Sequence, residues 1–240
     1  MIKIRNINKS FGNIHVLRDI SLDVSDGEIT AIVGPSGAGK TTLLQIAGSL
    51  ESADTGYVEY DGTVITSLKE KKLAKFRNAN IGFIFQFHEL LPEFTAAENV
   101  ALPAMIAGVS RRKAMRKAEE LLVSLGLGHR LRHKPGELSG GERQRAAIAR
   151  ALINNPKVIM ADEPTGSLDS HNREEIQNLI SSLCAERGHT FLMVTHDASL
   201  ASIAHRVVTM RDGRIDAITE KPSETFSPKE PEVAEKENNN

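Results

Sequence analysis

The chain has 240 residues and a mass of 26.2 kDa, enough for one large domain or two small ones. Hydrophobic residues make up 40% and charged residues 25%, so the bulk of the chain is expected to fold around a core. Lys and Arg total 30 against 31 Asp and Glu, a net charge of -1. This balance argues against a nucleic-acid partner, because neutralising phosphates requires a strongly cationic surface.

The single cysteine, Cys184, excludes an intrachain disulfide and a cysteine zinc cluster, and its apolar neighbours indicate a packed, unreactive thiol. The N-terminus has no apolar run typical of a secretory signal. The longest apolar run, near residues 100–109, is interrupted by Pro103 and Gly108, whereas a membrane-spanning helix needs about 20 residues. We therefore expect a cytoplasmic chain that reaches a membrane only through a partner.

Alternating apolar residues predict strands in the first third of the chain, and a hairpin is expected around Asp61 and Gly62. The predicted strands cover residues 2–7, 16–24, 28–33, 56–65 and 81–85, with one helix at 41–50. From about residue 95 to 154 the apolar spacing becomes helical. We interpret this stretch, about 88–155, as an inserted helical subdomain.

Strands and helices alternate after residue 155. Strands are predicted at 157–161, 190–195, 206–210 and 213–218, with a helix at 173–186 and an antiparallel ending. The fold class is therefore α/β: a mostly parallel sheet with helices, an N-terminal antiparallel β part and the inserted helices. Residues 1–220 are expected to form this domain. Residues 221–240, which are charged, rich in proline and without periodicity, are expected to be a disordered tail.

The first motif that carries chemistry is a glycine-rich loop between a predicted strand and a predicted helix, which matches G-x-x-x-x-G-K-[ST]. Its residues are Gly34, Pro35, Ser36, Gly37, Ala38, Gly39, Lys40, Thr41 and Thr42. Small residues let backbone N–H groups approach a phosphate chain, and the helix beginning at Lys40 adds its positive end. Lys40 is expected to reach the β- and γ-phosphates and the Thr41 hydroxyl to bind Mg²⁺. The loop therefore predicts the triphosphate of a nucleotide with Mg²⁺ as ligand, in a P-loop NTPase core.

The second motif is the apolar strand from Val158, which ends in two adjacent carboxylates, Asp162 and Glu163. Neighbouring side chains on a strand point to opposite faces, so both can serve one site only if the strand ends there and the chain curls. Pro164 and Gly166 make such a turn expected. Asp162 would then bind Mg²⁺, and Glu163 would orient and polarise the attacking water.

The third motif is Leu138 to Glu142. Ser139 and Glu142 form a capping box at the start of a predicted helix. Gly140 and Gly141 are costly at the first helical positions and make sense if something must approach this helix end closely. We interpret the helix end as a second anion site.

Together these motifs resemble the nucleotide-binding subunit of ABC transporters, over essentially all of residues 1–220. The resemblance implies roles for Gln86 as Q-loop glutamine and metal ligand, for His196 as switch histidine, for Asp169 at a dimer interface and for Phe11 as the ring that stacks on adenine. Asp169 could instead be only a helix cap, and Phe11 could pack in the core. In this family two copies sandwich two ATP molecules head to tail, and Ser139, Gly140, Gly141 and Glu142 would act on the partner's ATP.

The stretch from Phe85 to Pro103 resembles the lipoprotein-releasing and MacB-type ATPases, as does Glu142, where most ABC ATPases have glutamine. The resemblance implies an ATPase that powers transport and lies on the cytoplasmic side of the inner membrane. The expected function is to power the release of lipoproteins from the inner membrane. The alternative is a MacB-like efflux or cell-division ATPase with a different membrane partner. The expected partners are a second copy of the chain and integral membrane permease subunits. Apolar residues would dock on the permease or belong to the subdomain core: Phe87, Leu90, Leu91, Pro92 and Phe94.

Two other predictions remain. A nucleic-acid-repair ATPase with the same motifs would need long coiled coils between Lys40 and Ser139, which lie about one hundred residues apart without sustained heptads. The basic run at residues 111–117 is interpreted as a solvated helix face, with weak attraction to anionic lipid as the alternative.

Overall fold

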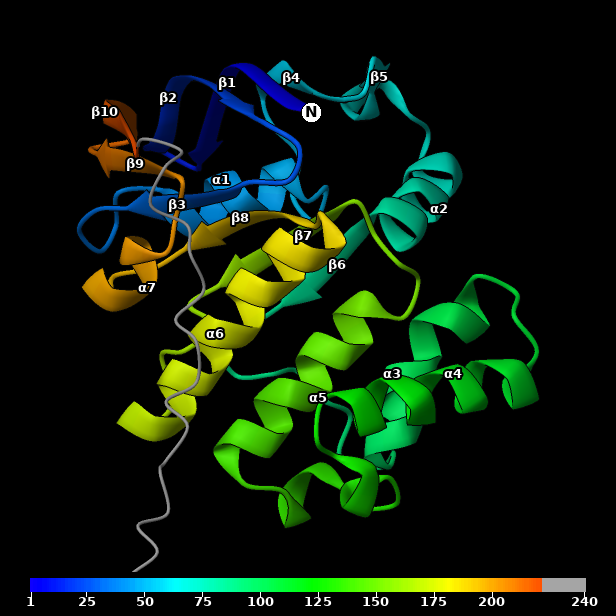
Figure 1. Ribbon diagram of the computed structural model, residues 1–240. Coiled ribbons are helices and arrows are strands. Elements are labelled where there is room, and N and C mark those ends of the chain that lie inside the picture. The colour runs from blue at the N-terminus through cyan, green and yellow to red at the C-terminus, as the bar shows by residue number, and fades with distance from the viewer. Residues whose placement is uncertain (222–240) are drawn as a thin grey trace, which may run out of the picture.

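The computed structural model describes residues 1–221, which form two β-sheets and a group of helices to one side (Figure 1). The strands are β1 (Ile2–Phe11), β2 (Ile14–Val24), β3 (Ile29–Val33), β4 (Thr55–Tyr60), β5 (Thr63–Val64), β6 (Ile81–Ile84), β7 (Val158–Asp162), β8 (Thr190–Val194), β9 (Arg206–Arg211) and β10 (Arg214–Glu220). The helices are α1 (Lys40–Ala47), α2 (Glu70–Asn80), α3 (Ala96–Ile106), α4 (Arg111–Ser124), α5 (Gly140–Leu152), α6 (Ser170–Arg187) and α7 (Ala198–Ser202).

The N-terminal sheet has the order β2-β1-β4-β5 and is antiparallel. The larger sheet has the order β10-β9-β3-β8-β7-β6 and is parallel except for the last pair, β9 and β10. The predicted fold class is therefore confirmed, including the antiparallel ending. Residues from β1, β2 and β4 share one core with α1 and with one face of the larger sheet.

The opposite face of the larger sheet is covered by α6 and part of α5 (Figure 1). The buried residues of α6, among them Ile176, Ile180 and Leu183, recur three or four positions apart, which explains why this segment forms an amphipathic helix. A third core lies among α3, α4 and α5 and is built largely from alanine, with Leu122 and Ile153. These small side chains let the three helices pack closely.

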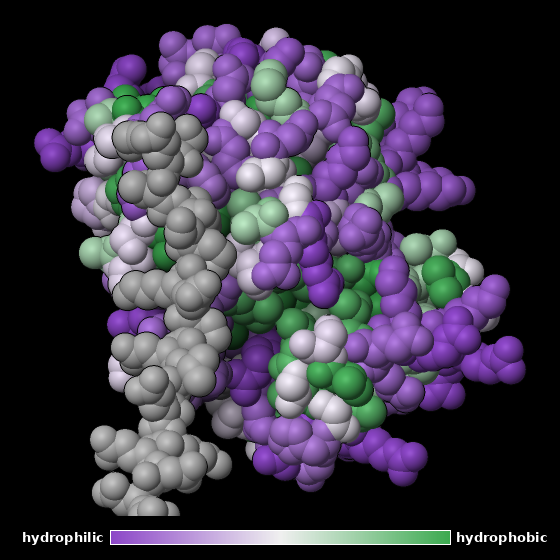
Figure 2. Space-filling model, viewed as in Figure 1, coloured by the Kyte–Doolittle hydropathy of each residue, from purple (hydrophilic) through white to green (hydrophobic). Residues whose placement is uncertain are grey.

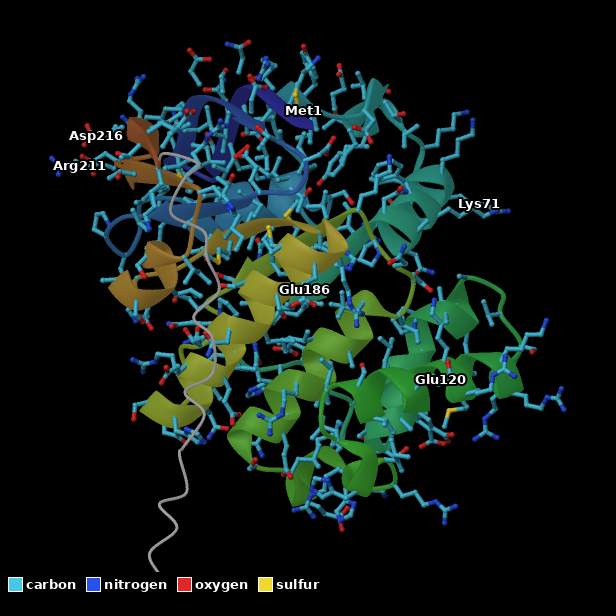
Figure 3. All side chains as sticks on the ribbon, in the orientation of Figure 1. Met1, Lys71, Glu120, Glu186, Arg211 and Asp216 are labelled. Atoms are coloured by element: carbon cyan, nitrogen blue, oxygen red, sulfur yellow. The ribbon has the colours of Figure 1, made fainter. Side chains whose placement is uncertain are left out.

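Helix α2 is absent from the sequence-based prediction. None of its residues is buried, so the segment carries no apolar stripe that would reveal a helix. The basic run at 111–117 forms the first half of α4, in which the arginines and lysines are exposed, as is the labelled Glu120 (Figure 3), whereas Ala114 is buried. The expected tail lies outside the described residues, apart from Lys221, whose backbone N–H donates to the carbonyl of His205 at 2.8 Å.

Candidate functional site

Four parallel strands, β3, β6, β7 and β8, end at the same edge of the larger sheet. Asp162 at the end of β7 pairs with Val194 of β8, and Val194 also pairs with Ile32 of β3. Each predicted catalytic element follows one of these strands: the phosphate loop follows β3, Gln86 follows β6, Glu163 follows β7 and His196 follows β8. The fold thus brings them to the edge where open α/β sheets bind ligands.

Three glycines give the phosphate loop its shape. Gly34, Gly37 and Gly39 have φ values of 147°, 79° and 94°, which residues other than glycine rarely adopt. A Cβ on Gly34 would lie 2.1 Å from the carbonyl oxygen of Met210, and one on Gly39 would lie 2.9 Å from that of Val16. Strands β9 and β2 therefore press directly on the loop. A Cβ added at Gly37 would meet nothing within 4 Å, so glycine is required there by its positive φ alone.

Lys40 is the first residue of α1, as the sequence predicts. Its Nζ atom donates to the carbonyl oxygens of Gly34 at 2.9 Å and Pro35 at 3.0 Å. The ammonium group is therefore held over the loop, where a phosphate chain would meet it together with the unpaired N–H groups of the helix end.

Thr41 and Asp162 come together from α1 and β7. The Thr41 hydroxyl donates to Asp162 Oδ1 at 3.2 Å, and burial raises the pKa of Asp162 while this hydrogen bond opposes the rise. A hydroxyl and a carboxylate, completed by water and phosphate oxygens, are ligands that Mg²⁺ accepts. Residues 1–221 contain no group of three His, Cys, Asp or Glu side chains able to hold a metal. The pair therefore fits Mg²⁺ only when a nucleotide supplies the other oxygens.

Glu163 lies directly after β7 in the left-handed conformation, with φ 47°. Its backbone N–H donates to the carbonyl of Val194 at 2.9 Å, which fixes the turn. The chain therefore curls at the end of the strand, as the sequence predicts, and both carboxylates can face one site. The Glu163 carboxylate accepts two hydrogen bonds from His196: Nδ1 lies 2.8 Å from Oε1, and the backbone N–H lies 3.3 Å from Oε2.

Gln86 packs against the turn that follows Glu163. The Ser167 hydroxyl donates to the Gln86 carbonyl at 3.3 Å, and a Cβ on Gly166 would lie 3.1 Å from Gln86 Nε2. Gln86 is therefore joined to the carboxylate-bearing loop. Asp169, at the end of the same loop, caps α6 by accepting from the backbone N–H and the side-chain amide of Asn172 at 2.9 and 2.8 Å.

Ser139 caps α5 in the predicted capping box with Glu142. Helix α5 lies in the lower half of Figure 1 and α1 in the upper half. Within residues 1–221 no hydrogen bond or ion pair joins Ser139 to the phosphate loop. Packing against α6 requires glycine at position 141, because a Cβ there would lie 1.9 Å from Asn172 Oδ1. The sequence does not reveal this contact. A Cβ added at Gly140 would meet Leu168 at 3.5 Å, an ordinary contact, so Gly140 is the glycine that leaves this helix end open.

Phe11 is exposed at the end of β1 and pairs with Ile14 of β2, the strand whose Val16 carbonyl lies against Gly39. A cation that sequence reasoning missed lies on its ring: Lys9 Nζ is 4.9 Å from the ring centroid and forms an ion pair with Glu51 at 2.8 Å. A lysine two residues before an aromatic residue on a strand gives no recognisable signal in a sequence.

The candidate docking segment after Gln86 divides into two parts. Phe87 is 73% exposed, and Leu91 and Phe94 are also exposed, whereas Leu90 packs on the helical core. Next to this segment lies a groove of about 460 Å³ between α2, β6, α3 and the end of α5. Figure 2 shows hydrophobic surface between the polar tips of α2 and α4.

The comparisons with known proteins agree with this geometry. The family model described as "ABC transporter" matches residues 17–166, and the chain belongs to this family. The prediction of an ATP-binding and ATP-hydrolysing subunit of an ABC transporter is thereby confirmed. No helix within residues 1–221 is long and apolar enough to cross a membrane.

Particular relatives are more specific. The chain is 60% identical over 215 residues to the lipoprotein-releasing system ATP-binding protein LolD of Bacteroides thetaiotaomicron, covering 90% of this chain and 99% of that protein. It is 58% identical to the protein of the same name from Bacteroides fragilis, covering 90% and 100%.

Two solved structures of the ATP-binding cassette MJ0796 each have a TM-score of 0.85 and cover 92% of this chain and 98% of that one. One, at 40% identity, is titled a dimeric structure of a bacterial ABC transporter cassette. The other, at 39% identity, is a dimer in a post-hydrolysis state bound to ADP and Pi.

Proposed function

We propose that this chain is the ATPase subunit of a lipoprotein-releasing transporter and that it works on the cytoplasmic face of the inner membrane. The observation that carries the proposal is the 57–60% identity to three relatives named as lipoprotein-releasing ATP-binding proteins, over 89–90% of the chain. The exposed Phe87, Leu91 and Phe94 beside the groove of about 460 Å³ supply an apolar surface for permease subunits.

The contacts of the site support the following catalytic roles. Lys40 exchanges the carbonyls of Gly34 and Pro35 for phosphate oxygens when ATP enters the loop. Thr41 and Asp162, with Gln86 nearby, would hold Mg²⁺, which when bound neutralises the developing phosphate charge. Glu163 orients the attacking water and accepts its proton, and His196 keeps the carboxylate turned toward the site. Phe11 offers its exposed ring to the base.

The site needs a second copy of the chain because Ser139 lies apart from the phosphate loop of its own chain. In the proposed head-to-tail dimer, Ser139, Gly140, Gly141 and Glu142 of one copy face the ATP held by Lys40 of the other. Asp169, at the end of the loop after Glu163, would lie at the interface. The dimeric state of the MJ0796 structures supports this assembly.

A mixed dimer tests the shared site. One copy carries Ser139→Arg and the other Lys40→Ala, both in a Glu163→Gln background that slows hydrolysis. In a head-to-tail dimer both substitutions fall at one ATP site and the other site has neither, so one ATP should be trapped per mixed dimer. If Ser139 instead acted on the ATP bound by its own chain, each site would carry one substitution. Trapping at neither site, with unmutated Glu163→Gln dimers trapping normally, would therefore reject the proposal.

Reconstitution tests the transport role. The purified permease and this chain are placed in proteoliposomes, and ATP-dependent release of a lipoprotein to a soluble acceptor is measured. Phe87→Ser should abolish release while the ATPase activity of the isolated chain stays within about twofold, since the side chain is exposed. Val123→Ser, at an exposed apolar position on α4, is the matched control and should release normally. Equal release by both variants would contradict the docking role of Phe87.

A further inference from the structure

The capping box at the start of α5 is held from outside the helix by an arginine. Ser139 and Glu142 bond reciprocally: the Ser139 backbone N–H donates to Glu142 Oε2 at 2.8 Å, and the Glu142 N–H donates to the Ser139 hydroxyl oxygen at 3.2 Å. The other carboxylate oxygen, Oε1, accepts from Arg130 Nε at 2.8 Å. Each oxygen of the carboxylate therefore has its own donor, and the side chain is fixed.

The arginine is itself fixed by the segment that carries it. Its Nη1 donates to His133 Nε2 at 3.2 Å, and the His133 carbonyl accepts from the backbone N–H of Ala96 at 2.8 Å, at the start of α3. Arg130 is 34% exposed and Glu142 only 12%. The guanidinium thus reaches inward to a shielded carboxylate, where an ion pair is screened less than at the surface.

The carboxylate is ionised at neutral pH. The Ser139 backbone N–H, with help from Arg130, lowers the pKa of Glu142 to about 2 despite its burial. The imidazole of His129 also faces this carboxylate, with Nε2 3.7 Å from Oε1. The anionic carboxylate of Glu142 thus lies three residues from Ser139, which would contact the phosphates of ATP. Without a neutralising cation, this carboxylate and the phosphates would repel each other.

We propose that Arg130 is a positioning residue of the signature serine: it neutralises the Glu142 carboxylate and locks the capping box, so that the Ser139 hydroxyl can face the partner's ATP. The inference rests on the proposed function, because it assumes that Ser139 acts across the dimer. In this role Arg130 acts through Glu142, whose Oε1 it contacts at 2.8 Å, and not on the reacting groups.

The chain contains a matched arrangement outside the site. Helix α3 begins with the capping box of Thr95 and Glu98, and Arg111 Nη2 lies 3.2 Å from Glu98 Oε1. The chemistry is the same, but Arg111 is 71% exposed and no site motif lies at this helix end. Arg111→Met therefore shows what the loss of a capping arginine does where no site motif depends on it, at a more exposed and more strongly screened ion pair.

The experiment compares Arg130→Met, Arg130→Lys, Glu142→Gln and the double variant Arg130→Met/Glu142→Gln in the full chain, with Arg111→Met as the control. ATP-dependent dimer formation is measured in the Glu163→Gln background by sizing chromatography, and kcat, KM and the ATP affinity of the monomer are measured separately. Melting temperatures show whether each variant folds.

We expect Arg130→Met to lower kcat and the dimer association constant about 10- to 100-fold, the worth of a hydrogen bond to a charged group. The monomer should bind ATP as before, because Lys40 and the phosphate loop are unchanged. In the Glu142→Gln background the same arginine substitution should cost less than about threefold, since no charge is left to neutralise. Arg130→Lys should restore part of the loss, and Arg111→Met should equal the parent.

Two results would overturn the inference. One is that Arg130→Met loses no more than Arg111→Met; the other is that its loss is as large in the Glu142→Gln background as in the parent. Either is distinguishable from failure of the proposed function. If the parent Glu163→Gln chain dimerises with ATP but Arg130→Met dimerises equally well, only the role of Arg130 fails. If the parent chain forms no ATP-dependent dimer, the shared site fails first.

Discussion

His196 holds Glu163 from two sides, with its imidazole Nδ1 2.8 Å from Oε1 and its backbone N–H 3.3 Å from Oε2. The contact joins the ends of β7 and β8, which are neighbours in the sheet. The left-handed conformation of Glu163 ends the strand after Asp162. If the strand continued, the side chains of Asp162 and Glu163 would point to opposite faces of the sheet.

The His196–Glu163 contact predicts the effect of His196→Ala. Without the imidazole the carboxylate loses its orienting partner, and kcat should fall by about 10²-fold or more, as when a general base is displaced. The KM for ATP should change little, since the phosphate loop is intact. Steady-state phosphate release measures both constants. His171→Ala, an exposed histidine on α6, serves as control, and equal losses in the two variants would contradict the assignment.

Lys40→Ala should abolish ATP hydrolysis and weaken nucleotide binding at least about tenfold, because charge-assisted hydrogen bonds to phosphate are worth about 1.5–3 kcal/mol. Binding is measured by titration with a fluorescent ATP analogue. Lys71→Ala, on the exposed face of α2 (Figure 3), removes a lysine elsewhere and should behave as the parent. Near-normal turnover by Lys40→Ala would refute the phosphate-loop assignment.

Gly34→Ala should lower the melting temperature more than Gly37→Ala does. At Gly34 the new Cβ would lie 2.1 Å from the Met210 carbonyl oxygen, so strand β9 or the loop must move. At Gly37 the space is open and only the left-handed backbone opposes the change, at about 1–2 kcal/mol. Calorimetry of the nucleotide-free proteins measures the difference. Equal melting temperatures would mean that the loop does not rest on β9.

Cys184 should react slowly with thiol reagents at pH 8. Burial raises the pKa of its thiol from 9.0 to about 11, so about a hundredfold less thiolate is present than in the unfolded chain. Because the folded protein holds this proton more tightly, the contribution of Cys184 to the free energy of unfolding is complete below pH 9 and is lost as the pH rises to about 11. Absorbance with a chromogenic disulfide in native and denatured protein checks this. Equal rates would show that the thiol is accessible.

The sequence predicts the fold class and the elements of the site because each functional residue follows a strongly apolar strand or opens a helix. The loop from Gly34 to Thr42 needs glycines for its φ values, and the curl at Glu163 follows from Pro164 and Gly166. These features are local, so the amino acids alone indicate them.

Features that depend on contacts between distant segments could not be predicted. Gly141 is a glycine because α6 brings Asn172 against it, and Arg130 reaches Glu142 across a loop. Helix α2 buries none of its side chains and so has no periodic signal. In each case the cause is a neighbour that only the folded chain supplies.

The close packing of the Met210 backbone against Gly34 has a consequence for the synthesis of the chain. Strand β3, which leads into the phosphate loop, is flanked by β8 and β9, both from the last quarter of the sequence. A chain still growing on the ribosome therefore lacks both supports of its nucleotide loop until residues near 210 have left the exit tunnel. We expect the emerging polypeptide to remain unable to capture ATP until both β8 and β9 are free to pair with β3.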